Sequence, residues 1–186
     1  MEELELYMDA AKEGMEAAIE HLEKDLSKIR AGKASPSMLD SVKLEYYGTV
    51  APLSQVANVT TPDARTIFIQ PWDKSVIQAI EKAILAANLG FNPANNGEVI
   101  RIMVPPLTEE RRVQLAKQVK AFGENAKVAI RNQRRDAIEE IKKLKKDGLS
   151  EDVAKDAEQD VHKTHEDYIK KVDLVVVAKE KEIMTV

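Results

Sequence analysis

The stretch LAKQVKAFGENAKVAIRNQRRDAIEEIKKL, residues 115–144, decides the fold. Its apolar residues recur every three or four positions, the spacing that places side chains along one face of an α-helix. These residues are Leu115, Val119, Phe122, Ala126, Ile130, Ala137, Ile141 and Leu144. Thr108 as the N-cap, followed by Glu109 and Glu110, predicts the start of the helix, and DGLSED, residues 147–152, predicts its end. A helix of nearly 40 residues with one apolar stripe must bury that stripe against other long helices.

Two further segments show the same periodicity. The first runs from Met1 to about Arg30, and the second begins after Ser150, its predicted cap, and extends nearly to the C-terminus. Their apolar stripes comprise Met15, Ala18, Ile19, Leu22, Leu26 and Ile29 in the first, and Val153, Ala157, Val161, Thr164, Tyr168, Val172 and Val175 in the second. We therefore expect a bundle of three long helices, formed by residues 1–30 and 106–186.

Residues 31–105 have a different pattern and are expected to form an inserted α/β domain with a sandwich-like arrangement. SVKLEYYG, RTIFIQPW and EVIRIMVPP predict three strands, because β-branched and aromatic residues partly alternate in them. DKSVIQAIEKAILAANLG, residues 73–90, predicts a helix capped by Asp73 and closed by Gly90. The segments GKASPS and MVPPL connect this domain to the bundle, and such paired connections allow hinge motion. The fold class is therefore α+β.

The aromatic residues of the inserted domain support two local expectations. We expect Phe68 and Trp72 to pack against the helix of that domain, because large aromatic side chains are mostly buried. Tyr46 and Tyr47 are adjacent in a predicted strand, so they should point to opposite faces, with at least one of them exposed.

The long helix at residues 109–147 carries 12 Lys and Arg against 7 Asp and Glu, although the whole chain has a net charge of -4. A rotation of about 100° per residue places eight of these cations within roughly one third of the helix circumference. We call this set the cationic stripe: Lys117, Lys120, Lys127, Arg131, Arg134, Arg135, Lys142 and Lys145. Only Glu124 among the acids falls in the same sector, and Asn132 faces away from it.

A segregated row of like charges favours an anionic partner, because like charges at helical spacing repel one another. Arginine can hold a phosphate through two hydrogen bonds and can stack on bases, so Arg131 and Arg134, one turn apart, suit RNA. An ordinary solvated surface and pairing with the acidic helices remain alternatives. The competing function is a non-catalytic helical scaffold or a general RNA-binding module.

Composition argues against several other classes. The chain has no cysteine, which excludes disulfides and thiolate catalysis. His162 and His165, three residues apart among carboxylates, are a weak candidate for a metal site, and we expect no metal, no cofactor and no catalytic residues. Neither a signal peptide nor a membrane-spanning segment is predicted, so we expect a cytoplasmic protein that is not an enzyme.

Four motifs, RAGKASPSML, LEYYGTVAPLSQVANVT, PPLTEERR and AKVAIRNQRRDAIEEIKK, occur in an order that closely resembles the bacterial ribosome recycling factor family. The resemblance covers essentially the whole chain. It implies an L-shaped protein with a three-helix bundle as one arm and a small α/β domain as the other. It also implies a role after translation termination: with elongation factor G, and GTP hydrolysis by that partner, the protein splits the ribosome into subunits and releases mRNA and tRNA.

The same resemblance assigns residues to roles. It places ribosomal RNA contacts of the large subunit at Arg131, Arg134, Arg135, Arg30 and Lys33, and the cationic stripe adds Lys127. The hinge regions would contain Gly32, Ser35, Pro36, Pro105 and Pro106. The α/β arm would face elongation factor G, and we expect a monomer without membrane contact. Where the family often has arginine, this chain has Lys33, which keeps the charge and loses the two-point geometry.

Overall fold

The computed structural model describes residues 1–185 of the chain and contains two compact units. One unit comprises Met1–Arg30 together with the residues from Glu109 onward, and the other comprises Ala31–Thr108. Each unit has its own hydrophobic core, so each is described separately. No helix within residues 1–185 is long and apolar enough to cross a membrane.

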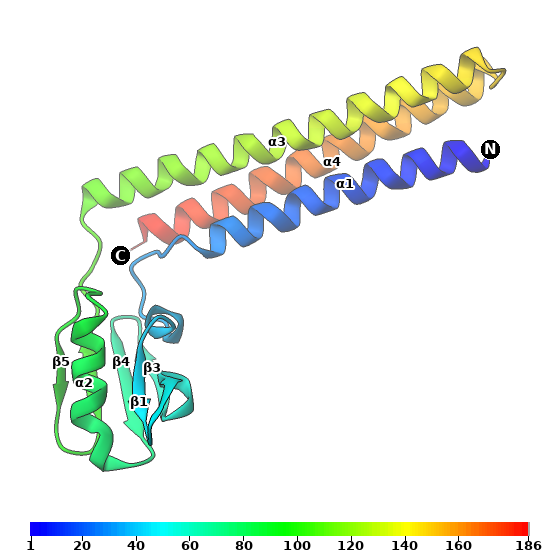
Figure 1. Cartoon of the computed structure of the whole chain (residues 1–186). Coiled ribbons are helices and arrows are strands. Elements are labelled where there is room, and N and C mark those ends of the chain that lie inside the picture. The colour runs from blue at the N-terminus through cyan, green and yellow to red at the C-terminus, as the bar shows by residue number, and fades with distance from the viewer. Residues whose placement is uncertain (186) are drawn as a thin grey trace. The chain divides into compact units, whose positions relative to one another are not determined.

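The first unit is a bundle of three helices: α1 (Glu2–Ser27), α3 (Glu109–Lys146) and α4 (Glu151–Met184), which lie side by side in Figure 1. Each helix buries one apolar stripe, and within residues 1–185 none of its charged residues is fully buried. In α1 the buried residues are Leu4, Ala11, Met15, Ala18, Ile19, Leu22 and Leu26. The three-helix bundle predicted from periodicity is confirmed, and so is the α+β class of the chain.

The buried stripe of α3 differs from the prediction at Phe122, Gly123 and Leu144. Leu115, Val119, Ala126, Ile130, Ala137 and Ile141 are buried as expected, together with Gly123. Phe122 and Leu144 are only half-buried. A Cβ on Gly123 would lie 2.6 Å from Cγ2 of Val176 on α4, so α3 and α4 approach each other closely at a position where α3 has no side chain. Periodicity places Phe122 at the seam, but the close contact needs the glycine beside it.

Two further features of the first unit are the N-terminus of α4 and a polar contact between α4 and α1. Ser150 occupies the N-cap position of α4, but its side chain makes no capping hydrogen bond, so the predicted cap is wrong in that respect. Buried Tyr168 on α4 donates a hydrogen bond of 2.5 Å to Oε2 of Glu16 on α1. Lys171 Nζ lies 3.9 Å from the same carboxylate oxygen and 4.4 Å from the Tyr168 ring centre. These contacts fix the register of α4 against α1.

The second unit contains two antiparallel sheets and one α-helix. β1 (Lys43–Tyr46) pairs with β2 (Thr49–Pro52). A four-stranded sheet has the order β3-β4-β6-β5, formed by β3 (Ala57–Asp63), β4 (Thr66–Pro71), β6 (Ile100–Met103) and β5 (Pro93–Asn95). The helix α2 (Ile77–Ala86) follows a 3₁₀ turn, Lys74–Val76, which Asp73 caps by accepting a hydrogen bond from Ser75 N.

Alternate residues of the two central strands build the core of this unit. Ile67, Ile69, Ile100 and Ile102 are fully buried, and they pack in one cluster with Ile80 and Ile84 of α2. The residues between them lie on the other face of the sheet, where the Arg101 guanidinium carbon is 5.1 Å from the Phe68 ring centre. This alternation is the one expected for strands with one buried face.

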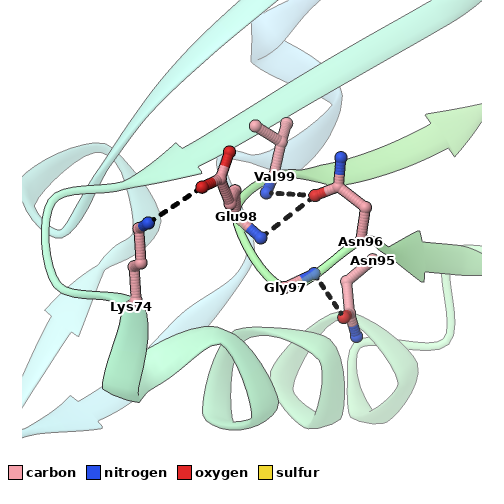
Figure 2. Close-up of polar contacts among 6 residues, drawn as sticks. All are labelled: Lys74, Asn95, Asn96, Gly97, Glu98 and Val99. Atoms are coloured by element: carbon pink, nitrogen blue, oxygen red, sulfur yellow. Dashed lines mark hydrogen bonds and ion pairs between the residues drawn. The ribbon is translucent and has the colours of Figure 1, made fainter.

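The structure has three strands that the sequence reading did not predict. One of them, β5, has only three residues and lies in the segment PANNGEV, residues 93–99, whose asparagines and glycine are typical of a turn. Figure 2 shows the turn itself: Asn95 Oδ1 accepts a hydrogen bond from Gly97 N, and Asn96 Oδ1 accepts from Glu98 N and Val99 N. Lys74 Nζ lies 3.1 Å from Glu98 Oε1 in the same view. The asparagine side chains therefore serve the turn, as Asn side chains often do.

The tyrosine prediction is partly wrong, because the chain turns at Tyr47. Tyr47 and Gly48 have φ of 48° and 79°, as the central residues of a type I′ hairpin turn require, and they connect β1 to β2. The rings of Tyr46 and Tyr47 therefore meet edge to face at 4.4 Å instead of pointing to opposite faces. Tyr47 is 82% exposed, so the expectation of one exposed tyrosine holds.

Two further local predictions are wrong. Trp72 is 70% exposed and does not pack against α2, because it lies after the last residue of β4 and outside the alternation of that strand. The helix α2 ends at Ala86, and the left-handed residue after its C-cap is Asn88, with φ of 52°. Gly90 also has positive φ, but it lies two residues beyond that position. Asparagine tolerates the left-handed region, which explains the earlier end.

Candidate nucleic-acid interface

The members of the cationic stripe differ in how they are neutralised within the bundle. Lys127 Nζ is 2.6 Å from Asp173 Oδ1 on α4 and 3.6 Å from Glu124 Oε1 on its own helix. Lys120 Nζ lies 4.0 Å from Glu180 Oε1, and Lys145 Nζ lies 2.9 Å from Glu151 Oε1. The stripe therefore runs along the edge of α3 that faces α4, and several of its cations already have carboxylate partners.

Lys127 is the most strongly held of these lysines. Its side chain is only 18% exposed, and its hydrogen bond to Asp173 raises the pKa of the ammonium group above its ordinary value. An external phosphate would have to displace this carboxylate, because an ammonium in a short bond to Asp173 has a donor already engaged. Lys127, predicted from phase alone to contact RNA, therefore lies in an interhelical ion pair.

The arginines form the accessible part of the stripe. Arg131 is exposed and Arg134 is half-buried, and neither makes an ion pair with any carboxylate within residues 1–185. Arg135 has one distant contact, 3.9 Å to Oδ1 of its neighbour Asp136, and both side chains are exposed, so water and salt weaken it. We call Arg131, Arg134 and Arg135 the arginine cluster.

His165 of α4 lies beside the arginine cluster. Burial and then the charges of Arg134 and Arg131 lower the pKa of the imidazole below its ordinary value. Its Nε2 is buried and has no hydrogen-bond partner among the described residues. At neutral pH this histidine is therefore uncharged, and α4 presents no carboxylate in contact with the arginines at this level of the bundle.

The other residues of the arginine motif face different neighbours. Gln133 points toward α1, where its side-chain amide would meet a Cβ on Gly14. Asn132 is exposed and lies between these two directions. The motif RNQRRD therefore divides between the α1 contact and the α4 edge, and it presents only its arginines to the side where the cationic stripe runs.

The structure does not bring Arg30 next to the arginine cluster. Gly14 lies level with Gln133, and α1 continues from there for 13 residues to Ser27, about 20 Å at 1.5 Å per residue. Arg30 follows this end and is exposed. Lys33 is exposed as well but belongs to the second unit. Any RNA contact that used Arg30 and the cluster together would extend along the bundle.

Of the expected hinge residues, some are fixed to the second unit. Ser35 accepts a hydrogen bond from Ser37 N and caps the 3₁₀ helix Pro36–Leu39, and Ala34 N donates to Ala64 O at 2.7 Å. Gly32 has φ of +75°, and a Cβ there would lie 2.7 Å from Cγ of Leu107, so the two connecting segments run side by side.

The second connecting segment follows β6. Val104 N donates to Arg65 O at 2.7 Å, and Pro105 and Pro106 then lie outside any helix or strand. The backbone positions least tied to either unit are therefore those around Gly32 and around the two prolines.

The histidines do not form a metal centre with neighbouring acids in the described part of the chain. Residues 1–185 contain no group of three or more His, Asp or Glu side chains placed to hold a metal ion. Pairing of the cationic stripe with an acidic helix, an alternative that the sequence left open, occurs at Asp173, Glu180 and Glu151 of α4, and none of these acids was predicted from the sequence. The sequence does contain a pattern that indicates such acids: Glu166, Asp173 and Glu180 recur every seven residues, which places them on one side of the helix.

Together, the fold and the candidate interface define an α+β protein of two units, in which a bundle of three long helices presents an arginine cluster. The sequence model described as "Ribosome recycling factor" matches residues 22–184. The chain belongs to the ribosome recycling factor family.

Individual relatives agree with this assignment over the full length of the chain. A ribosome-recycling factor of Christiangramia forsetii is 59% identical over 186 residues, covering 100% of both chains. A solution structure of a ribosome recycling factor has a TM-score of 0.72 and 39% identity, again with complete coverage. A third match, with a TM-score of 0.59, 44% identity and coverage of 98% and 99%, is T. thermophilus ribosome recycling factor in a structure with E. coli elongation factor G and the E. coli post-termination complex.

Proposed function

We propose that this protein recycles ribosomes after translation termination. The observation that carries the proposal is its family membership over essentially the whole chain. In the proposed reaction the protein binds the post-termination ribosome and, with elongation factor G and GTP hydrolysis by that partner, splits the complex into subunits. Messenger RNA and transfer RNA are then released. The protein acts as a cytoplasmic monomer, without membrane contact and without catalytic residues of its own.

The arginine cluster supplies the proposed anchor on ribosomal RNA of the large subunit. Arg131 and Arg134 have no carboxylate partner within residues 1–185, so binding a phosphate does not require them to break an existing ion pair. Their planar groups can each engage a phosphate through two hydrogen bonds. Arg135, Arg30 and Lys33 are exposed cations that can add further contacts, while Lys127 contributes less because Asp173 holds it.

The second unit supplies the proposed contact with elongation factor G. The assembly that contains a family member together with this factor on a post-termination complex supports that partner. Movement of the second unit would use the connecting segments at Gly32 and at Pro105–Pro106, where few hydrogen bonds hold the backbone. In this mechanism the bundle stays anchored while force on the other unit disrupts contacts between the ribosomal subunits.

The direct test is a subunit-splitting assay with purified post-termination ribosomes, elongation factor G and GTP, with and without this protein. Splitting that does not depend on the protein refutes the proposed function. The anchor is tested with Arg131→Ala and Arg134→Ala, each expected to weaken binding to large subunits and to lower the log–log salt slope by about 1.

The control for these variants is Lys24→Ala, which removes an exposed cation of another helix, α1. It should bind and split as the parent does, and helix content by circular dichroism should be the same for all three variants. If the protein were a scaffold without RNA contact, the arginine variants and the parent would bind large subunits with the same salt dependence.

A further inference from the structure

The acids on the α4 edge repeat every seven residues and meet the cationic stripe in a regular register. The pairs that show this register are Lys120 with Glu180 and Lys127 with Asp173. The two helices are antiparallel. A position seven residues later in α3 therefore lies opposite a position seven residues earlier in α4. The next step would place Glu166 opposite Arg134, but no ion pair forms there.

The pairing is strongest at Lys127. Asp173 accepts a hydrogen bond of 2.6 Å from this ammonium group, and Glu124 adds a second carboxylate at 3.6 Å. At Lys120 the contact is longer, 4.0 Å, but Oε1 of Glu180 is buried and accepts no hydrogen bond from another residue. Asp173 thus neutralises Lys127, whereas the Lys120 side chain, 69% exposed, is held only weakly by Glu180.

At the arginine cluster α4 presents His165 instead of a carboxylate. His165 is adjacent to Glu166, the position that the seven-residue register places at the level of Arg134, and the charges of Arg134 and Arg131 act on its imidazole. A carboxylate in this place would bind the arginines directly, because guanidinium and carboxylate groups pair with matching geometry. A neutral imidazole at this level of α4 does not neutralise the cations.

We propose that α4 determines where along α3 RNA can bind: Asp173 masks Lys127, Glu180 partly masks Lys120, and His165 leaves Arg131 and Arg134 available. The masking acids act as intramolecular competitors of phosphate. This inference rests on the proposed RNA contact and deepens it, because it makes α4 a determinant of specificity although its residues need not touch RNA. It predicts a gain of binding when a mask is removed and a loss when one is added.

Removing the mask is tested with Asp173→Asn, which keeps the shape and an acceptor oxygen while it removes the charge. The probe is a labelled RNA duplex of unrelated sequence, titrated at several salt concentrations. We expect roughly threefold tighter binding at moderate salt and a log–log slope that is steeper by about 1, since Lys127 becomes a further phosphate contact. The matched control is Asp167→Asn, an exposed position on the same helix, which changes the net charge equally.

Adding a mask is tested with His165→Glu against His165→Gln. The glutamate is expected to lower affinity for purified large ribosomal subunits at least about tenfold, because two cations lose their availability. The glutamine variant should remain within about twofold of the parent, and both should keep the helix content of the parent by circular dichroism.

Two results overturn the inference: equal salt slopes for Asp173→Asn and Asp167→Asn, or equal affinities for His165→Glu and His165→Gln. Failure of the proposed anchor looks different, because Arg131→Ala and Arg134→Ala would then bind large subunits as the parent does. If the arginine variants lose binding and the α4 variants bind as the parent does, the masking inference is refuted and the proposed RNA anchor stands.

Discussion

Two glycines in the bundle predict opposite effects of the same substitution. Both Gly14 on α1 and Gly123 on α3 lie in helix interiors without positive φ, where alanine is favoured over glycine by about 1 kcal/mol. What a new methyl group would meet differs between them. At Gly14 it meets the flexible end of Gln133, and at Gly123 it meets Cγ2 of Val176 at 2.6 Å.

The magnitudes follow from how easily each neighbour can move. The Gln133 amide can rotate away, so Gly14→Ala should stabilise the bundle by up to about 1 kcal/mol. Val176 is β-branched and has one strongly preferred rotamer in a helix, so α3 and α4 must separate to admit the methyl group. Such overpacking costs about 1–3 kcal/mol, which leaves Gly123→Ala destabilised by about 0–2 kcal/mol after the gain in helix propensity.

The assay is thermal unfolding followed by circular dichroism at 222 nm. This signal reports the bundle, because α1, α3 and α4 have 26, 38 and 34 residues whereas α2 has 10. For a chain of this size 1 kcal/mol corresponds to about 2–4 °C in Tm, so the two variants should move in opposite directions. A Tm for Gly123→Ala at or above that of Gly14→Ala would refute the tight α3–α4 contact. Adding Val176→Ala to Gly123→Ala should recover part of the loss.

Three further predictions concern single side chains. The hydrogen bond from Tyr168 to Glu16 raises the pKa of the phenol from 10.0 to about 12, so its contribution to stability is complete below pH 10 and is lost between pH 10 and 12. Tyr168→Phe should remove this alkaline component from the pH dependence of Tm. Burial and the charge of Arg134 lower the pKa of His165 below 6.5, so the contribution of the neutral imidazole to stability is complete above pH 6.5 and is lost as the pH falls below that value. The Tm of His165→Asn should therefore fall less between pH 7 and acidic pH than the Tm of the parent. Trp72→Ala should change the free energy of unfolding by no more than about 0.5 kcal/mol in urea titrations, because this side chain is 70% exposed, and a loss of several kcal/mol would place it in the core after all.

The helices could be predicted from the sequence because their signal is local and repeated many times. Eight apolar residues of α3 agree on one face, and the acidic first turn at Glu109 and the break at Gly148 agree with the ends of the helix. The close contact at Gly123 could not be predicted in this way. It depends on where Val176, 53 positions away in the chain, lies against α3.

The strands were harder to predict because they are short and their turns are unusual. The hairpin between β1 and β2 has Tyr47 at a position that usually holds asparagine or glycine, so the pattern suggested one longer strand. The edge strand β3 contains Pro62 and a register shift between Thr60 and Asp63, which interrupt its alternation. Each of these features is stabilised by contacts with other strands, and such contacts leave little trace in a local pattern.

The candidate interface shows the same difference between local and tertiary information. Helical phase correctly places Lys127 and Arg131 on one side of α3, but phase treats all cations on that side as equal. Under the proposed masking, α4 decides their availability: Lys127 Nζ lies 2.6 Å from Asp173 Oδ1, whereas Arg131 has no ion pair within residues 1–185. A basic stripe read from one helix therefore gives an upper limit on the RNA contacts, and the neighbouring helix determines how many of them remain.

This arrangement also explains how a chain with a net charge of -4 could bind a polyanion selectively. At physiological ionic strength a charge is screened over about 8 Å, so the arginine cluster attracts phosphates only at short range. Beyond that distance a net negative protein gains nothing from general attraction to RNA. Masking of the neighbouring lysines reduces the surface that attracts phosphates further. Binding then requires that the few remaining arginine–phosphate contacts form together, which is possible only on an RNA whose shape admits the bundle. Under the proposed function, the acids of α4 reduce affinity for RNA in general and thereby favour the ribosomal site.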